Sequence, residues 1–230
     1  QDPNIIMIGE IRDDETARIA VRASITGHLV LSTLHTNNSL NTIERLADMD
    51  VERYLLGSSL EGIISQRLAR KLCPECRIKR STTPYERQVF NTVLNKDITE
   101  MYVANKEGCP RCNHGYKGRL AILEVLVMND KIKDAITNNL PKHELRDLVY
   151  TGEVVTLLQD GLNKVILGET SFEEILKIID LENDMSTYKD DNLKVNLRMA
   201  QKAHQNGGIN NSSNSPTPET TSVNVETVEF

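Results

Sequence analysis

The chain has 230 residues, of which 33 are acidic and 27 are Lys or Arg, so its formal net charge is −6. An acidic chain of this composition gives no overall case for a nucleic-acid-binding protein. No apolar run approaches the roughly 18 residues that a membrane span requires, and no signal peptide is visible. The length is sufficient for one large domain or two small ones.

The first segment of the chain predicts a strand that ends in a carboxylate. Residues 4–8 are mostly apolar and are followed by Gly9 and Glu10, a pattern typical of a short buried strand. In α/β domains that hydrolyse nucleotides, a carboxylate at the carboxyl end of such a strand handles Mg²⁺ or the attacking water. The pattern alone also fits an ordinary exposed acid.

Domains of that kind need a glycine-rich phosphate loop, which normally precedes the acidic strand. The sequence contains no such loop, and only nine residues come before Glu10. We therefore expect the chain to start within a catalytic domain, with Glu10 as one half of an active site.

The next elements are predicted to alternate between helix and strand. Residues 13–26 carry small apolar side chains at helical spacing and acids in the first turn, and residues 28–34 form a second apolar run. This order favours a parallel sheet in an α/β fold. Further helices are expected from Ser39 and over about residues 60–71.

The second half predicts mostly helices around one strand. Thr83, with proline and glutamate after it, indicates a helix start with a capping box, and residues 118–128 predict a strand. Short helices are expected over residues 129–180, the last of them with a second capping-box pattern at Ser171.

Two histidines flank the second predicted strand. His28 stands at its start and His35 just after its end, followed by Thr36 and Asn37. If the two strands are parallel neighbours, Glu10 and His35 lie at the same sheet edge, where ligands of such sheets bind. A single histidine there is commonly structural, but the combination with Glu10 predicts a cluster that senses phosphate.

Four cysteines form two C-P-x-C pairs, which are separated by 32 residues. Such pairs can present four thiolates tetrahedrally, the geometry of a closed structural Zn²⁺ site, with Cys73, Cys76, Cys109 and Cys112 as ligands. A redox dithiol and an iron–sulfur cluster are the alternatives, and His114 is a possible replacement ligand. Without secretory features, the cysteines favour metal over disulfides and a cytoplasmic setting.

The segment that holds the cysteines is basic. Residues 73–119 contain nine Lys and Arg against five Asp and Glu. Lys117 and Arg119 in particular would suit an acidic protein partner or an anionic lipid surface, although a solvated loop explains them equally well.

Residues 2–72 resemble the secretion ATPase superfamily that drives type II secretion and type IV pilus assembly. Residues 2–13 are similar to its atypical Walker B region, residues 26–37 to its histidine box, and residues 66–74 to the passage that leads to its metal subdomain. The resemblance extends to about residue 180. It implies an α/β fold: the C-terminal part of a RecA-like P-loop NTPase domain, with an inserted tetracysteine zinc subdomain and a helical C-terminal region.

The resemblance assigns roles to individual residues. Glu10 would polarise the water that attacks the γ-phosphate of ATP, with help from Mg²⁺, and His35 would sense that phosphate. His28 would orient the histidine box or contact a neighbouring subunit. Arg12 would have an electrostatic or subunit-contact role toward the nucleotide, unless it merely pairs with Asp13 or with the acid after it.

The same resemblance implies the setting of the protein. It would be an ATPase that works as a homo-hexamer at the inner face of the plasma membrane, cytoplasmic and peripheral, docked on the cytoplasmic domains of an inner-membrane platform protein. No nucleic-acid partner is expected. Without a phosphate loop, this chain alone should be inactive. The tetracysteine arrangement occurs in the pilus-extension and type II secretion branches, which these residues do not separate.

We expect four regions along the chain. They are the second half of the ATPase core, the zinc subdomain, a strand with the C-terminal helices, and a mostly disordered tail: 1–72, 73–119, 120–180 and 181–230. The tail is expected because much of it is polar and cannot bury enough apolar surface. The alternative function is a stand-alone zinc-binding module that binds a protein or nucleic acid, which would leave Glu10 and the histidines unexplained.

Overall fold

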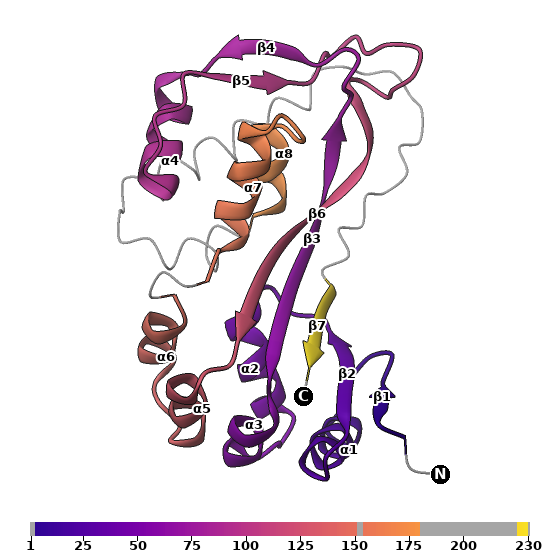
Figure 1. Cartoon of the computed structure of the whole chain (residues 1–230), viewed down its shortest axis with the longest axis vertical. Coiled ribbons are helices and arrows are strands. Elements are labelled where there is room, and N and C mark those ends of the chain that lie inside the picture. Colours follow the sequence, from indigo (N-terminus) through magenta and orange to yellow (C-terminus); the bar gives the residue numbers. More distant parts are fainter. Residues whose placement is uncertain (1–2, 151–153, 180–224, 230) are drawn as a thin grey trace. The chain divides into compact units, whose positions relative to one another are not determined.

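The computed structural model describes residues 3–150 and 154–179 and the backbone of the strand 225–229. The chain divides into two compact units, which are described separately below (Figure 1). Unit 1 is formed by Gln1–Gln66, Leu123–Thr156 and Asn224–Phe230, and unit 2 by Arg67–Ile122 and Leu157–Val223.

A five-stranded sheet forms the frame of unit 1. Its strands follow the order β1-β2-β7-β3-β6, and β3 and β6 continue into unit 2. Their bounds are β1 Ile5–Met7, β2 Leu29–Leu34, β3 Gly62–Leu72, β6 Tyr116–Val127 and β7 Val225–Glu229.

The pairing of β1 with β2 is parallel, as the sequence predicted, and Ile6 lies opposite Val30. Strand β7 lies between β2 and β3 and runs antiparallel to both of them, so the sheet is mixed. Part of the expected disordered tail is therefore a strand. The rest of that tail, residues 180–224 and 230, lies outside the described residues.

Helices of unit 1 start where the sequence places side-chain caps. Asp13 accepts a hydrogen bond from the Thr16 amide at the start of α1, and Asn38 and Asn129 cap α2 and α5 in the same way. The bounds are α1 Asp14–Ile25, α2 Ser39–Asp48, α3 Arg53–Ser59, α5 Asp130–Thr137 and α6 Lys142–Val149. The expected helices from residues 13 and 39 are thereby confirmed.

One apolar core holds unit 1 together. Ala17 and Ala20 of α1, Ile43 of α2 and Val30 of β2 are all fully buried in it. Helices α3 and α5 approach each other closely at Gly57, where an added Cβ would lie 2.7 Å from the Lys133 carbonyl oxygen. A larger residue at Gly57 would therefore push the two helices apart.

The helix expected over residues 60–71 is wrong, because those residues form most of β3. Burial alternates along that strand with a period of two: Ile63, Ser65 and Arg67 are buried, and Ile64 is exposed. Two of the three buried positions carry polar side chains. The apolar residues alone therefore hid the alternation.

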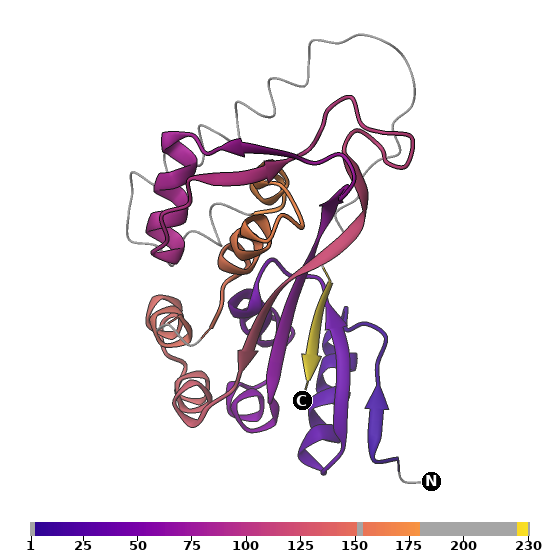
Figure 2. The same cartoon turned by 45° about the horizontal axis from the view of Figure 1, so that its top comes forward.

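Unit 2 contains a two-stranded antiparallel sheet and three helices, with one end each of β3 and β6 (Figure 2). The bounds are β4 Ile78–Ser81, α4 Pro84–Leu94, β5 Glu100–Val103, α7 Leu157–Ile166 and α8 Phe172–Ile178. Its core includes Phe90 and Phe172, whose ring centroids are 5.8 Å apart. The strand expected over 118–128 is confirmed as the main part of β6.

The two predicted capping boxes have different outcomes. At α4, Thr83 Oγ1 accepts from the Glu86 amide and Glu86 accepts from the Thr83 amide, so the box is complete. At α8, Ser171 caps the Glu174 amide, but the Glu174 carboxylate turns to Arg70 instead. The second box is therefore only half formed.

Among the helices of the described residues, none is long and apolar enough to cross a membrane.

Candidate functional site

The carboxyl ends of β1 and β2 bring Glu10 and His35 together. The parallel register continues past β1, because the Ile8 amide donates to the Leu31 carbonyl at 2.9 Å and the Ile11 amide donates to the Thr33 carbonyl at 3.0 Å. The two strands thus leave the sheet side by side, and the residues that follow them face one another.

Glu10 lies between two basic side chains. Its Oε1 is 2.9 Å from His35 Nε2, and its Oε2 is 2.6 Å from the Arg12 guanidinium. The side chain of Glu10 is 21% exposed, against 55% for His35 and 75% for Arg12. The carboxylate is therefore the shielded centre of the cluster, and its two partners face the solvent.

The hydrogen bond from Arg12 lowers the pKa of Glu10 below its ordinary value. The carboxylate is therefore charged at neutral pH and can act as a hydrogen-bond acceptor. Arg12 does not pair with its acidic neighbours along the chain, which was the alternative for it. Asp13 caps α1 and Asp14 pairs with Arg18.

His28 lies away from this cluster, at the amino end of β2. Its Nδ1 is 3.0 Å from the Ala23 carbonyl and 3.2 Å from Thr26 Oγ1, which ties it to the end of α1. At about 3.3 Å per residue, an extended strand separates His28 from His35 by about 23 Å. A role of His28 in the same reaction centre therefore stays a prediction without a contact to support it.

The four cysteines of unit 2 converge on one point. Their sulfur atoms all lie within 4.8 Å of one another, with Cys73 and Cys109 at 3.8 Å and Cys76 and Cys112 at 3.6 Å. These distances far exceed a disulfide bond of about 2.05 Å. Four thiolates at about 2.3 Å from one tetrahedral ion would be about 3.8 Å apart, so the arrangement fits a closed metal site.

Backbone amides shape the two cysteine loops. The amide of Cys73 donates to the Gly115 carbonyl at 2.8 Å, and the amide of Cys109 donates to the Cys112 sulfur at 3.1 Å. Gly115 has a φ of +83°, and an added Cβ there would lie 2.6 Å from the Asn105 carbonyl oxygen. Only glycine can therefore hold this turn beneath the sulfur cluster.

The thiols differ in how readily they ionise. Burial opposes the ionisation of Cys112, but hydrogen bonds from backbone amides outweigh it and lower its pKa to about 7. For Cys76, burial and the neighbouring thiols raise the pKa to about 12. A bound cation would remove the opposition between the four sulfurs, because each of them binds it as a thiolate.

His114 is not a member of the cluster. Among the described residues, the group of side chains that can share one ion consists of the four cysteines alone. The His114 ring lies near the Lys106 carbonyl instead, with Nδ1 at 3.2 Å. The expectation that four cysteines make His114 unnecessary as a ligand agrees with this geometry.

Sequence reasoning missed a set of buried carboxylates in unit 2. Glu174 is 5% exposed and binds Arg70, with 2.8 Å from Arg70 Nε to Oε2, and Glu86 is 7% exposed and binds Arg80 at 2.7 and 2.8 Å. Each pair joins residues that the pattern of one element does not connect. The capping-box motifs at positions 86 and 174 were the only signal that these acids matter.

Comparison with known proteins agrees with both sites. The family described as "Type II/IV secretion system protein" matches residues 1–177, which include Glu10, His35 and all four cysteines. A putative type II secretion system protein E of Escherichia coli K12 is 46% identical over 179 residues, which cover 77% of this chain and 36% of that protein. The type IV pilus assembly ATPase PilB of Thermus thermophilus is 41% identical over 182 residues, 76% of this chain and 20% of that protein.

Among solved structures, the pilus retraction motor PilT with bound ADP is similar to this chain. The TM-score is 0.53 and the identity 27%, over 78% of this chain and 40% of that one. The fold is thus that of the C-terminal part of a RecA-like ATPase domain, as the sequence predicted. The chain belongs to the type II/IV secretion system protein family.

The family match covers both units, so the stand-alone zinc module loses its support. The chain spans about a third of the length of the type II secretion relatives that it matches, 35% to 36% for the first five of them.

Proposed function

We propose that this chain is part of an ATP-hydrolysing motor subunit that powers type II protein secretion or the assembly of type IV pili or pseudopili. The observation that carries the proposal is the position of Glu10, a charged carboxylate held between His35 and Arg12 at the carboxyl end of the parallel pair β1 and β2. Members of the family with the same motifs bear names such as ATPase E and PilB.

In the proposed reaction, Glu10 accepts a hydrogen bond from the water that attacks the γ-phosphate of ATP. Both of its oxygens are engaged in the structure, Oε1 by His35 and Oε2 by Arg12. A phosphate group that draws His35 toward itself would free Oε1 for the water. His35 would thus couple the presence of the γ-phosphate to the availability of the carboxylate.

Mg²⁺, when bound with ATP, would neutralise charge on the β- and γ-phosphates. Arg12, which is exposed beyond its pair with Glu10, is proposed to add positive charge near the nucleotide or at a subunit junction. His28 is proposed to hold the histidine box against the end of α1, through its contacts with Ala23 and Thr26.

For the cysteines we propose a structural Zn²⁺ held by Cys73, Cys76, Cys109 and Cys112. The sulfur distances support this, and four protein ligands leave no open position for a substrate. The boundaries 73–119 for the zinc subdomain, 1–72 for the ATPase part, 120–180 for the strand and C-terminal helices, and 181–230 for the tail are part of the same proposal.

The sheet of unit 1 supports assembly with further protein. The face opposite the buried residues of β3 and β6 exposes apolar side chains, which soluble proteins seldom leave uncovered over such an area. They are Ile5, Met7, Leu29, Ile64, Leu123, Val125 and Val127. We propose that the upstream part of the motor, in which a phosphate loop would lie, covers this face.

The proposed setting is a homo-hexamer on the cytoplasmic side of the inner membrane, bound to the cytoplasmic domains of a platform protein of the secretion or pilus machine. Nucleotide sites at the junctions between subunits would let hydrolysis turn one subunit against the next. The exposed positions of Arg12 and His35 are compatible with such junctions.

The test requires a chain with a phosphate loop. The region that precedes the matching segment in the Escherichia coli relative can be joined ahead of Gln1, and ATP turnover measured by phosphate release. We expect Glu10→Gln to lower kcat by about 100-fold or more. The matched control is Glu15→Gln, an exposed acid of α1, which should leave turnover unchanged.

Equal turnover of the Glu10→Gln and parent chimeras would contradict the proposal. The 230-residue chain alone should not hydrolyse ATP, because its sequence has no phosphate loop. Turnover by that chain, abolished by Glu10→Gln, would contradict the proposal that the phosphates are held by protein outside it.

A further inference from the structure

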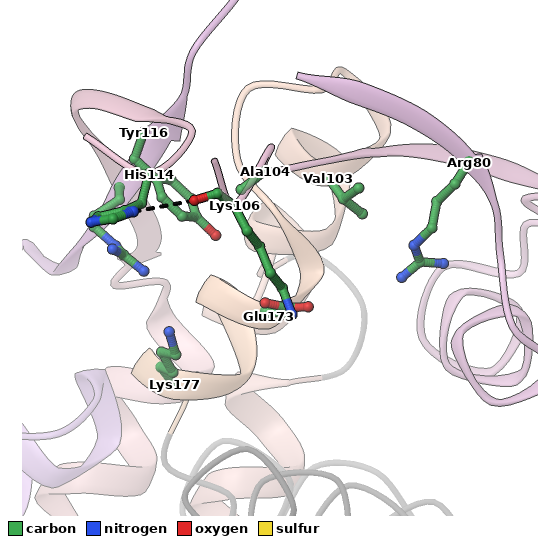
Figure 3. Close-up of a pocket in the computed structure, with 9 residues that line it drawn as sticks. Arg80, Val103, Ala104, Lys106, His114, Tyr116, Glu173 and Lys177 are labelled. Atoms are coloured by element: carbon green, nitrogen blue, oxygen red, sulfur yellow. Dashed lines mark hydrogen bonds between the residues drawn. The ribbon is translucent and has the colours of Figure 1, made fainter. Parts of the chain in front are cut away.

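Unit 2 contains a cavity of ≈ 500 Å³ beside the cysteine cluster (Figure 3). Three parts of the unit form its wall: the facing ends of β3 and β6, the loop between β5 and the second cysteine pair, and helix α8. The lining residues are Arg70, Arg80, Val103, Ala104, Lys106, His114, Tyr116, Glu173 and Lys177. Cavities that hold small molecules have volumes of about 300–1,000 Å³, so this one is large enough for more than a single ion.

Basic side chains dominate the wall. Arg70, Arg80, Lys106 and Lys177 face a single acid, Glu173. The side chains drawn in Figure 3 come from different elements and point into the same space. Such convergence of Arg and Lys is the usual basis for recognising phosphate groups.

The two arginines are held in place from behind. Buried Glu174 fixes Arg70 through its Nε and one terminal nitrogen, and buried Glu86 fixes Arg80 through both terminal nitrogens. The Arg70 guanidinium also stacks on the Tyr116 ring, 3.9 Å from its centroid. These contacts orient the guanidinium groups before any ligand arrives, which lowers the entropy cost of binding.

Donors remain free for a ligand. In the described part of the chain, Arg70 Nη1, Arg80 Nε and Lys106 Nζ make no hydrogen bond or ion pair, and Lys177 shares Glu174 with Arg70 at 3.1 Å. Glu173 likewise has no hydrogen-bond partner there, and a carboxylate among basic groups can accept from hydroxyl groups of a ligand.

We infer that this cavity binds a soluble small molecule that carries phosphate and hydroxyl groups, such as a sugar phosphate or a nucleotide. The basic residues take the phosphate and Glu173 takes the hydroxyl groups. Because Lys106 and His114 flank the cysteine pair Cys109 and Cys112, the ligand joins the metal loop to α8 within unit 2. This inference goes beyond the proposed motor function and does not depend on it.

The experiment uses the zinc-loaded 230-residue chain and two probes, inorganic pyrophosphate and ribose 5-phosphate, with binding measured by calorimetry. Both probes should bind the parent chain. Lys106→Gln with Lys177→Gln should weaken both by about tenfold or more, since two charge-assisted contacts are lost. The matched control is Lys117→Gln with Lys131→Gln, two exposed lysines outside the cavity, for which we expect less than about a twofold change.

Glu173→Gln separates the two halves of the inference. It should weaken ribose 5-phosphate while leaving pyrophosphate equal or stronger, because a repulsive charge is removed. Amide chemical-shift changes on titration should concentrate in residues 104–116 and 171–177 and leave residues 4–37 unmoved, which checks the site without any variant.

Three results would overturn the inference. The first is no binding of either probe, and the second is equal weakening by the control pair, which would indicate general charge attraction. The third is binding to anionic phospholipid vesicles but to neither soluble probe, which would indicate a membrane-facing surface. If Glu173→Gln affects both probes alike, hydroxyl recognition is wrong.

Discussion

The cysteine cluster of unit 2 and the carboxylate cluster of unit 1 both join two short motifs, but they differ in how much of their chemistry they contain. All four sulfurs face one another, and each loop is fixed by backbone amides of the same unit. Glu10, in contrast, is held by two side chains that are more than half exposed. The first site is closed and its ligands are complete, whereas the second presents a charged group outward.

This difference indicates what each region does for the protein. A closed site stabilises the fold around it, and its loss should be felt as unfolding. An open site depends on groups that other protein segments or a ligand supply, and its loss should be felt as lost activity with the fold intact. The predictions below test this division, starting with the largest effect on stability.

Removal of one metal ligand should produce the largest change. We expect about one Zn²⁺ per parent chain, and Cys109→Ser should release it and cause cooperative unfolding of the cysteine loops, because three thiolates no longer close the site. Metal content by mass spectrometry and thermal unfolding followed by circular dichroism measure both effects.

His114→Ala is the matched control, because His114 lies beside the loops without joining the cluster. It should keep the metal and the unfolding midpoint. An iron absorption spectrum, or a folded chain of unchanged stability without metal, would contradict the zinc assignment.

Loss of the Arg70–Glu174 pair should come next. Arg70→Met leaves the carboxylate of Glu174, 6% exposed, with Lys177 as its remaining partner. We expect a loss of about 2–3 kcal/mol in the free energy of unfolding, below the value for a fully buried pair because Arg70 is 42% exposed. Lys177→Met, which removes the exposed partner, should cost only about 0.5 kcal/mol.

The same pair predicts a pH dependence. Burial opposes the charge of Glu174, but Arg70 and Lys177 outweigh it and lower its pKa in the folded chain. The stabilisation is therefore present above the unfolded pKa of about 4.3 and is lost as the pH falls below it. In Arg70→Met, denaturant unfolding between pH 6 and pH 3, roughly the range that brackets that pKa, should show a weaker acid loss; an identical slope would contradict the assigned cause.

The helix cap of α4 should have a smaller effect. Thr83→Ala removes the acceptor for the Glu86 amide and should lower the free energy of unfolding by about 1 kcal/mol. Thr83→Ser keeps the hydroxyl and should stay close to the parent. Equal losses in both variants would show that the methyl group of Thr83, and not its hydroxyl, is responsible.

The outcome for sequence reasoning follows the same division. Features that depend on a few neighbouring residues were predicted correctly: the strand before Glu10, the cap at Thr83, and the cysteine pairs. The proximity of Glu10 and His35 was also predicted, because the parallel order of two apolar strands determines which ends meet.

Features that join distant segments were missed. Strand β3 was taken for a helix because tertiary contacts, not hydrophobicity, bury Ser65 and Arg67. The pairing of β7 between β2 and β3 has no local signal, since those residues follow a long polar stretch. The basic cavity draws its wall from three segments, and nothing in one of them indicates the others.

The smallest effect on stability is expected at the proposed catalytic carboxylate itself. Glu10→Ala removes two exposed ion pairs, which contribute little to the stability of a fold in water. The unfolding midpoint should therefore not change measurably. The matched substitution in the same unit is Glu124→Ala, because Glu124 is 3% exposed and accepts from the Ser39 amide and the Tyr150 hydroxyl.

Glu124→Ala should cost about 1–3 kcal/mol, since it leaves those two donors without their acceptor. Chemical denaturation of both variants measures the contrast. If Glu10→Ala destabilises unit 1 as much as Glu124→Ala does, Glu10 is a structural residue of the sheet edge. In that case the open site of unit 1 is no different in kind from the closed site of unit 2.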